Sequence, residues 1–174
     1  MLVRHAEPVL PAGRGEENDR PLSPAGAAAA RALADTLAHE PLAAVYSSPY
    51  PRAVQTAEPI ARIHGLAVEI VDDLRERLLA TAVVADWYAE VRRTWDDFDH
   101  VLPGGESSRA AQERANRVLA ELAGRHPSAT IVAASHGNLI ALALNARDAA
   151  VGFDHWDAME MPALYEIEVD PGRA

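Results

Sequence analysis

The sequence predicts an α/β fold of three layers, α/β/α, with a mainly parallel central sheet. Short apolar runs of strand type alternate along the chain with longer, Ala-rich segments of helical type. Two of these runs, at residues 1–4 and 130–134, are each followed at once by a histidine-bearing turn. Only 5% of the residues are aromatic, which favours Ala-rich helices over a β-sandwich. Strands that alternate with helices form βαβ units, whose parallel sheet is covered on both faces.

Five segments are predicted to be strands from their apolar runs or their alternation. These segments are residues 1–4, 43–47, 66–71, 130–134 and 164–169. The segment 130–134 has the most buried composition of the five. The alternation of polar and apolar residues in 164–169 indicates a final edge strand.

The helices are predicted from capping residues and apolar periodicity. Ser23-Pro24 is an N-cap followed by proline at the first helical position, and it opens a helix over 24–39. Ser48-Pro49 repeats this signal and predicts a helix that ends near His64, where Gly65 terminates it. The later helices are expected over 78–91, 107–125 and 137–145, and residues 6–22 and 95–105 are expected to be loops.

A chain of 174 residues is expected to form a single domain, residues 1–174, with a sizeable core. Residues 78–104 fit the alternation of strands and helices least well. They are interpreted as an insert that forms a lid over the substrate. This insert and the loop 8–20 are where substrate selection is expected.

The composition excludes several functional classes. The net charge is −10 and no basic stripe is present, so nucleic acid is not an expected partner. Disulfides and thiolate metal sites are excluded because the chain has no cysteine. No apolar run is long enough to span a membrane, and no signal peptide is visible, so a cytoplasmic location is expected. The oligomeric state stays open, a homodimer included.

Charged and imidazole side chains follow the predicted strands at one edge of the sheet. Arg4 and His5 follow the first strand, Arg52 lies in the first turns of the helix after the second, and His136-Gly137 follows the strand 130–134. Ligands of open α/β sheets bind beyond the carboxyl ends of the strands. Two guanidinium groups, two imidazoles and a helix N-terminus suit a phosphoryl group. An imidazole can also attack phosphorus.

Such a reaction needs a proton donor for the leaving alcohol. Glu76 follows the third predicted strand and is the candidate for this role, because a nearby phosphate would raise the pKa of its carboxyl. Asp73 and Asp72 are the alternatives.

Taken together, these segments resemble the histidine phosphatase superfamily, the group that includes cofactor-dependent phosphoglycerate mutases. The motifs stand in the family's order and extend from residue 2 to about 140. They are Leu2-Val3-Arg4-His5-Ala6-Glu7, Asp19-Arg20-Pro21-Leu22-Ser23 with Gly26, Ser47-Ser48-Pro49 with Arg52-Ala53 and Gln55-Thr56-Ala57, Leu74-Arg75-Glu76, Gly104-Gly105-Glu106-Ser107, and Ser135-His136-Gly137.

The resemblance implies a role for each site residue. His5 would be the nucleophile that carries a phosphohistidine. The phosphoryl group would be bound by Arg4, Arg52 and His136 and by the backbone N–H of Gly137. Glu76 would be the general acid and then the base that activates water. The resemblance implies no metal ion and no organic cofactor, and a small phosphorylated metabolite as substrate.

The chain departs from the family pattern in the substrate loops. Ala6 replaces the usual glycine after the nucleophile, and Pro8-Val9-Leu10-Pro11 replaces a polar segment with an asparagine found in mutase-like members. Phosphomonoester hydrolysis is therefore the predicted reaction. The alternatives are a mutase, a phosphatase acting on phosphohistidine or phosphoserine in proteins, and a non-catalytic phosphate-binding module.

Overall fold

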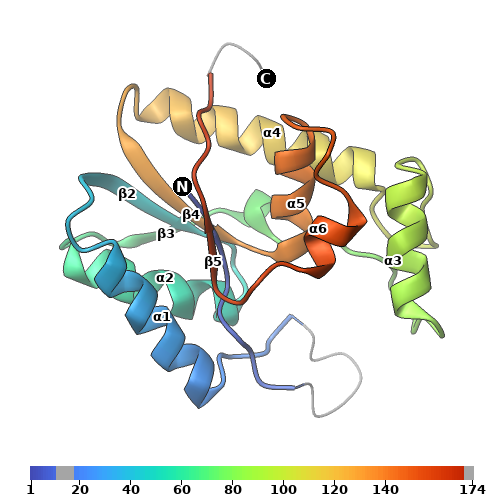
Figure 1. Cartoon of the computed structure of the whole chain (residues 1–174), viewed down its shortest axis with the longest axis horizontal. Coiled ribbons are helices and arrows are strands. Elements are labelled where there is room, and N and C mark those ends of the chain that lie inside the picture. Colours follow the sequence, from blue (N-terminus) through green and yellow to red (C-terminus); the bar gives the residue numbers. More distant parts are fainter. Residues whose placement is uncertain (11–17, 171–174) are drawn as a thin grey trace.

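The computed structural model describes residues 1–10 and 18–170, which form one five-stranded sheet with helices on both faces (Figure 1). The strand order is β3-β2-β4-β1-β5. All neighbouring strands are parallel except β5, which lies antiparallel to β1 at one edge. The strands are β1 (Leu2–Arg4), β2 (Leu42–Ser47), β3 (Val68–Ile70), β4 (Thr130–Ser135) and β5 (Ala163–Tyr165). The expected three-layer fold with a mainly parallel sheet is confirmed.

The helices divide between the two faces of the sheet (Figure 1). They are α1 (Pro24–Thr36), α2 (Pro51–Ile63), α3 (Trp87–Asp96), α4 (Ser108–Arg125), α5 (Gly137–Asn145) and α6 (Phe153–Asp157), with a 3-10 turn at Asp72–Leu74. Helices α1 and α2 pack on one face, and α4 and α5 pack on the other. Helices α3 and α6 lie beyond α5, on the side of the second face.

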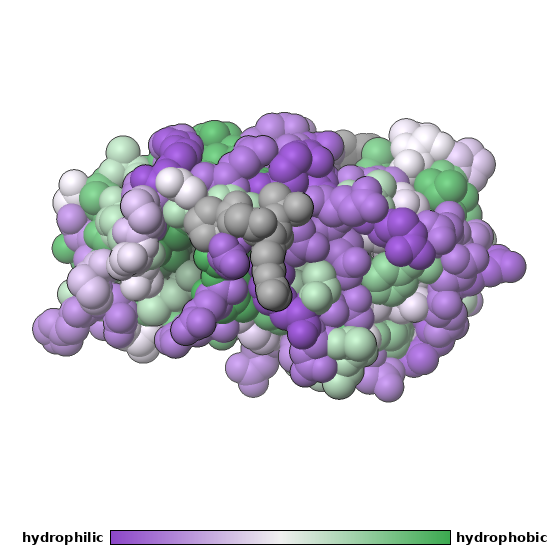
Figure 2. All heavy atoms as spheres, turned by 90° about the horizontal axis from the view of Figure 1, so that it is seen from above, coloured by the Kyte–Doolittle hydropathy of each residue, from purple (hydrophilic) through white to green (hydrophobic). Residues whose placement is uncertain are grey.

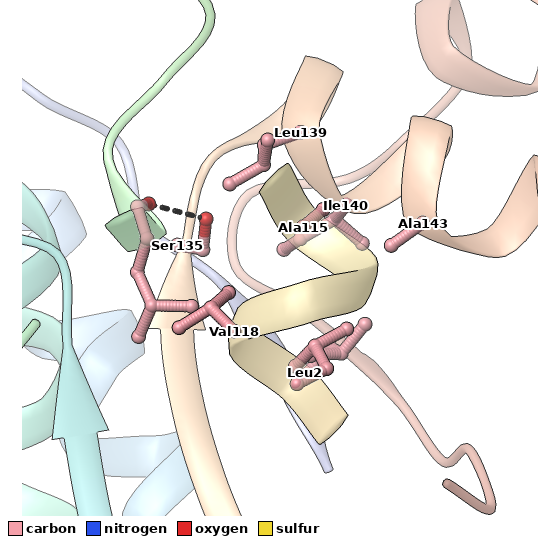
Figure 3. Close-up of a pocket in the computed structure, with 9 residues that line it drawn as sticks. Leu2, Ala115, Val118, Ser135, Leu139, Ile140 and Ala143 are labelled. Atoms are coloured by element: carbon pink, nitrogen blue, oxygen red, sulfur yellow. Dashed lines mark hydrogen bonds between the residues drawn. The ribbon is translucent and has the colours of Figure 1, made fainter. Parts of the chain in front are cut away.

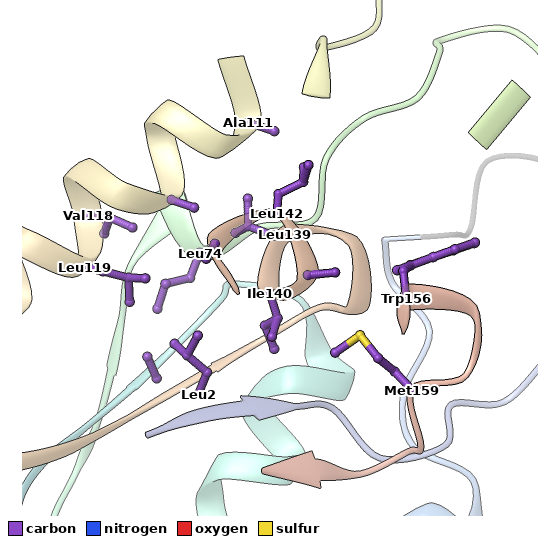
Figure 4. Close-up of a cluster of buried hydrophobic side chains, with 14 of the residues drawn as sticks. Leu2, Leu74, Ala111, Val118, Leu119, Leu139, Ile140, Leu142, Trp156 and Met159 are labelled. Carbon is purple, nitrogen blue, oxygen red and sulfur yellow. The ribbon is translucent and has the colours of Figure 1, made fainter. Parts of the chain in front are cut away.

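Alternating strand residues supply the two cores, because successive side chains of a strand point to opposite faces. Leu2 belongs to the core under α4 and α5, whereas Val3 belongs to the core under α1 and α2. In the same way, Tyr46 belongs to the core under α4 and α5, and Val45 belongs to the core under α1 and α2. Figure 4 shows the larger core, in which side chains of α4 face those of α5 above β1. The layers therefore follow from the period-2 pattern of short strands.

Two helix starts are as predicted, and one is not. The Ser23 hydroxyl accepts a hydrogen bond from the Gly26 N–H (2.9 Å), and the Ser107 hydroxyl accepts one from the Ala110 N–H (3.1 Å). The predicted cap at Ser48 is wrong. Helix α2 begins at Pro51, its N-cap residue is Tyr50, and no side chain caps it. The Ser48 side chain instead lies in the site described below.

The segment 78–104 differs most from the prediction. The helix expected over 78–91 is wrong, because the chain becomes helical only from Trp87. The Asp86 side chain caps this helix by accepting from the Ala89 N–H (3.0 Å). The residues before Asp86 include the β-branched Thr81, Val83 and Val84, which restrict helix formation and have no local cap. The final strand is shorter than expected, and α6 was not predicted.

The face of the molecule on which α4 lies is mostly hydrophilic, with hydrophobic residues scattered over it (Figure 2). Within the residues that the structure describes, no helix is long and apolar enough to cross a membrane.

Candidate active site

Three neighbouring parallel strands deliver the site residues to the same edge of the sheet. Arg4 at the end of β1 is level with Ser135 at the end of β4, and Ser47 of β2 is level with Ala134. The backbone continues this pairing beyond the strands, because the His5 N–H donates to the Ser135 carbonyl (3.0 Å). The predicted convergence of these strand ends is therefore confirmed.

The ring of His5 is buried and its orientation is fixed on both sides. Nδ1 lies 2.8 Å from the Ala6 carbonyl oxygen. A carbonyl can only accept, so Nδ1 carries the proton and Nε2 carries the lone pair. That lone pair accepts a hydrogen bond from Nε of Arg52 (3.2 Å). The site thus presents a nucleophilic nitrogen next to a guanidinium group.

Burial sets the charge state of His5. Desolvation by burial is the largest of the causes that lower the pKa of His5 to about 3. The hydrogen bond to the Ala6 carbonyl raises this pKa, whereas the positive charges of Arg52 and Arg4 lower it further. At neutral pH the ring is therefore uncharged, as a nucleophile must be.

His136 lies beside His5, with 5.2 Å between the ring centroids. It is fully buried, and Nε2 lies 2.7 Å from the Ser48 hydroxyl oxygen. Desolvation by burial lowers the pKa of His136 well below its usual value, and His5 and Arg52 contribute to the shift. Among the described residues, Nδ1 of His136 has no hydrogen-bond partner.

Arg4 packs directly against the start of α5. A Cβ atom at Gly137 would lie 3.0 Å from Nε of Arg4, so glycine permits this close approach. One terminal nitrogen of Arg4 donates to the Met159 carbonyl, which follows α6. Nε of Arg4 is buried and has no partner within the described part of the chain. Two arginines and two uncharged histidines give this site a positive charge in an acidic protein.

Glu76 lies at the N-terminus of α5 rather than free on the rim of the site. Its Oε2 accepts from the Asn138 N–H (3.0 Å), and its Oε1 accepts from the Leu139 N–H (3.0 Å) and the Arg77 N–H (2.8 Å). The expectation that α5 points free N–H groups at an anion is thus wrong for Asn138 and Leu139, because Glu76 occupies them.

The alternative acids, Asp72 and Asp73, are paired with arginines. Asp72 binds Arg75 (2.7 Å), and Asp73 binds Arg75 (3.0 Å) and Arg117 (3.1 Å). Nearby in the same network, Arg114 is buried and forms an ion pair with Glu106 (2.7 Å).

Two buried residues that carry no predicted role support the site. Thr56 accepts from the Ala6 N–H (3.0 Å) and donates to the Arg52 carbonyl (2.7 Å), so it ties the loop after His5 to α2. Thr56 stands in the Gln55-Thr56-Ala57 motif, four residues after Arg52, but the sequence predicted no role for it. Arg77 joins Asn138 to Thr94 of α3 through bonds of 3.1 and 3.0 Å, and no local pattern indicates these contacts.

Neither a metal cluster nor the small apolar cavity in the core competes with this site. Among the described residues, no group of three or more His, Cys, Asp or Glu side chains could hold a metal ion. Figure 3 shows the cavity between β1, α4 and α5, which is lined almost entirely by apolar side chains. Its one hydroxyl, on Ser135, already donates to the Leu74 carbonyl (2.7 Å). This cavity is therefore unsuited to an anion.

Comparison with known proteins assigns the family. The model of the histidine phosphatase superfamily (branch 1) matches residues 1–174. The phosphoserine phosphatase 1 of Hydrogenobacter thermophilus is 35% identical over 147 residues, which is 78% of this chain and 69% of that protein. An uncharacterised protein of Mycobacterium tuberculosis is 48% identical over 77 residues, 43% of this chain and 38% of that protein. This chain belongs to the histidine phosphatase superfamily, as its motifs predicted.

Solved structures show the same fold. A mycobacterial glucosyl-3-phosphoglycerate phosphatase aligns with a TM-score of 0.72 and 26% identity, over 83% of this chain and 76% of that chain. The complex of that phosphatase with VO3 aligns over 92% of this chain and 84% of that chain, with a TM-score of 0.69 and 26% identity. The phosphoserine phosphatase of Entamoeba histolytica in complex with 3-phosphoglyceric acid aligns at 22% identity, with a TM-score of 0.63 over 83% of this chain and 76% of that chain.

Proposed function

We propose that this chain is a phosphatase that hydrolyses small phosphomonoesters through a phosphohistidine on His5. One observation carries the proposal: His5 is buried and uncharged, and its Nε2 lone pair lies 3.2 Å from Nε of Arg52. The names of the relatives and of the similar structures, most of them phosphatases, support the reaction class. The proposal requires neither a metal ion nor an organic cofactor.

In the first step, Nε2 of His5 attacks phosphorus. A nitrogen–phosphorus bond forms while the bond from phosphorus to the ester oxygen breaks. The ring then carries a phosphoryl group on Nε2 and a proton on Nδ1, and the Ala6 carbonyl at 2.8 Å stabilises that cationic ring. Arg4, Arg52 and His136 bind the phosphoryl oxygens. Positioning and charge stabilisation supply most of the rate in such transfers.

Buried polar atoms without partners support these assignments. Buried polar groups are nearly always hydrogen-bonded, and each exception needs an explanation. Nε of Arg4 and Nδ1 of His136 are both buried without a partner among the described residues. Phosphoryl oxygens would accept hydrogen bonds from both nitrogens, and also from the Gly137 N–H.

Glu76 donates the proton that the leaving alkoxide needs. Its Oε2 accepts one backbone hydrogen bond, whereas Oε1 accepts two, so Oε2 is the oxygen with room for a proton. In the second step the Glu76 carboxylate takes a proton from water, the hydroxide attacks phosphorus, and the nitrogen–phosphorus bond breaks. His5 returns uncharged and inorganic phosphate leaves.

The substrate is a small phosphorylated metabolite. Residues 78–104 act as the lid of a single domain and carry α3. Arg77 links this segment to the start of α5 through Thr94 and Asn138, so the lid is fixed to the acid side of the site. The loop 8–20 supplies further selection, and its residues 11–17 lie outside the described part of the chain. A screen of phosphorylated metabolites, with and without a bisphosphate primer, separates hydrolysis from mutase transfer.

Replacement of the nucleophile tests the proposal. His5→Ala should retain less than about a hundredth of wild-type kcat, a loss of about 2.7 kcal/mol in barrier terms. Protein stopped with base during turnover of a 32P-labelled substrate should carry label in the wild type and none in His5→Ala. His39→Ala, at an exposed histidine, is the matched control and should keep both activity and label. Label on His5→Ala would identify another nucleophile.

A further inference from the structure

The Ser48 hydroxyl contacts a site histidine where the sequence predicted a helix cap. Ser48 is fully buried, and its oxygen lies 2.7 Å from Nε2 of His136. The same oxygen accepts a hydrogen bond from the Tyr50 N–H (3.2 Å). These two contacts leave few arrangements for the single hydroxyl proton.

Counting donors and acceptors assigns that proton. A serine hydroxyl has one O–H donor and two lone pairs, and the Tyr50 N–H already uses one lone pair. If Nε2 of His136 donated to the other lone pair, the O–H would need an acceptor. Within the described residues, the Ser48 hydroxyl has no contact other than Tyr50 and His136. A buried O–H without an acceptor costs about 1–3 kcal/mol. The arrangement that satisfies the Ser48 hydroxyl fully has it donating to Nε2 of His136.

We infer that Ser48 is a positioning residue that fixes His136 in the tautomer with its proton on Nδ1. Nε2 is then the acceptor of the Ser48 hydroxyl, and Nδ1–H is the one ring donor left for a phosphoryl oxygen. This is the buried atom without a partner among the described residues. The uncharged state of His136, which follows from its burial, makes the choice of tautomer decisive, because a neutral imidazole has only one N–H.

The inference deepens the proposed function, on which the phosphate contact of His136 rests. In the opposite tautomer, Nδ1 would present a lone pair to an anionic oxygen and repel it. Ser48 would therefore increase phosphate affinity without contacting phosphate itself. The neighbouring Ser47 offers a comparison, because it is equally buried but its hydroxyl donates to the Ser48 carbonyl (2.8 Å) and not to a ring.

The test is the tautomer of His136, read from the 15N chemical shifts of its ring in 15N-labelled protein. The signals are assigned by their loss in His136→Asn. The wild type should show a protonated Nδ1 and a bare Nε2. A bare Nδ1 with a protonated Nε2 would overturn the inference, whatever the catalytic activity.

Variants separate positioning from structure. Ser48→Ala should lose the single-tautomer pattern and bind inorganic phosphate at least about tenfold more weakly, as expected for one hydrogen bond to a charged group. Ser48→Thr, which keeps the hydroxyl, should restore both, and Ser47→Ala should keep the tautomer. An unchanged tautomer in Ser48→Ala would contradict the inference. If the wild type shows His136 protonated on Nδ1 but binds no phosphate, the proposed function is rejected. The positioning role of Ser48 would then still stand.

Discussion

At the scale of single residues, the backbone of α5 holds the carboxylate of Glu76. In the proposed reaction this contact would keep the Glu76 carboxyl in place, because Oε1 keeps two N–H bonds whether or not Oε2 carries the proton. It also means that a substitution here affects the start of α5 as well as proton transfer.

A comparison of leaving groups isolates proton transfer. Glu76→Gln should lower kcat for an alkyl phosphate by about 10²–10⁴-fold, the usual contribution of a general acid. It should lower kcat for p-nitrophenyl phosphate far less, because the phenolate leaves without a proton. A purely structural effect on α5 would lower both rates equally. Equal losses would therefore reassign the role, with Asp73 the next residue to replace.

The buried histidines make stability depend on pH. The unfolded chain binds a proton at each histidine near pH 6.5, whereas burial lowers the pKa of His5 to about 3 and that of His136 well below its usual value. The unfolded state thus binds more protons below pH 6.5. The stability due to each uncharged ring is complete above that pH and is lost as the pH falls below it. For His5 this loss continues down to a pH of about 3.

His5→Asn should show this linkage in urea unfolding. Between pH 7.5 and pH 5.0, the wild type should lose about 2 kcal/mol more of its free energy of unfolding than the variant does, at about 1.4 kcal/mol per pH unit below 6.5. Subtracting the two proteins removes the common contribution of the carboxylates. Parallel losses in the two proteins would contradict an uncharged, buried His5.

At the scale of elements, the first turn of α1 touches the loop that follows the nucleophile. A Cβ atom at Gly26 would lie 2.0 Å from the Glu7 carbonyl oxygen, and the Ser23 N–H donates to that same oxygen (2.9 Å). The glycine is needed here for the close approach of two backbones. Helix α1 thereby supports the segment that carries His5.

Gly26→Ala should consequently push α1 away from this loop. The expected cost is about 1–3 kcal/mol in the free energy of unfolding, the usual range for an added group in a packed region. The value is measured by urea denaturation. Gly152→Ala is the matched control, since a Cβ atom there meets nothing within 4 Å. Equal free energies of unfolding for the two variants would show that the loop after His5 moves away from α1 at little cost.

Elements with local signals could be predicted from the sequence, and those decided by distant contacts could not. The helices after Ser23 and Ser107 begin where their caps indicate, because a cap acts within one turn. The Ser48 signal failed because His136, 88 residues away, engages its hydroxyl. The site residues also divide into those that the sequence predicted and those that it did not. The rule that strand ends meet brought Arg4, His5 and His136 together, but nothing near Met159 or Arg77 in the sequence indicates the contacts they make.

At the scale of the whole molecule, the site joins layers that lie on opposite faces of the sheet. Arg52 comes from α2 on one face, and Gly137 opens α5 on the other. A phosphate held by both should stabilise the complete fold, because a ligand that binds only the folded state shifts the unfolding equilibrium.

Thermal unfolding with inorganic phosphate measures this coupling. At a phosphate concentration 100 times Kd, stability should rise by about 2.7 kcal/mol, which raises Tm by about 5–10 °C in a chain of this size. Arg52→Ala should lose most of that rise. Arg31→Ala, at an exposed position of α1, should keep it. An equal rise in both variants would place the bound phosphate elsewhere.

The position of β1 between β4 and β5 has a consequence for the order of events during synthesis. β1 is synthesised well before its neighbours, because the strands on either side of it begin at Thr130 and Ala163. The Met159 carbonyl, which accepts from Arg4, follows that arginine by 155 residues. A nascent chain that stops before β4 already contains Arg4, His5, Arg52 and Glu76 but lacks His136 and the central strand of the site. Contacts this distant in sequence also slow folding. The His5 imidazole therefore cannot be enclosed by the site until β4 and the segment around Met159 have been synthesised and have joined the sheet.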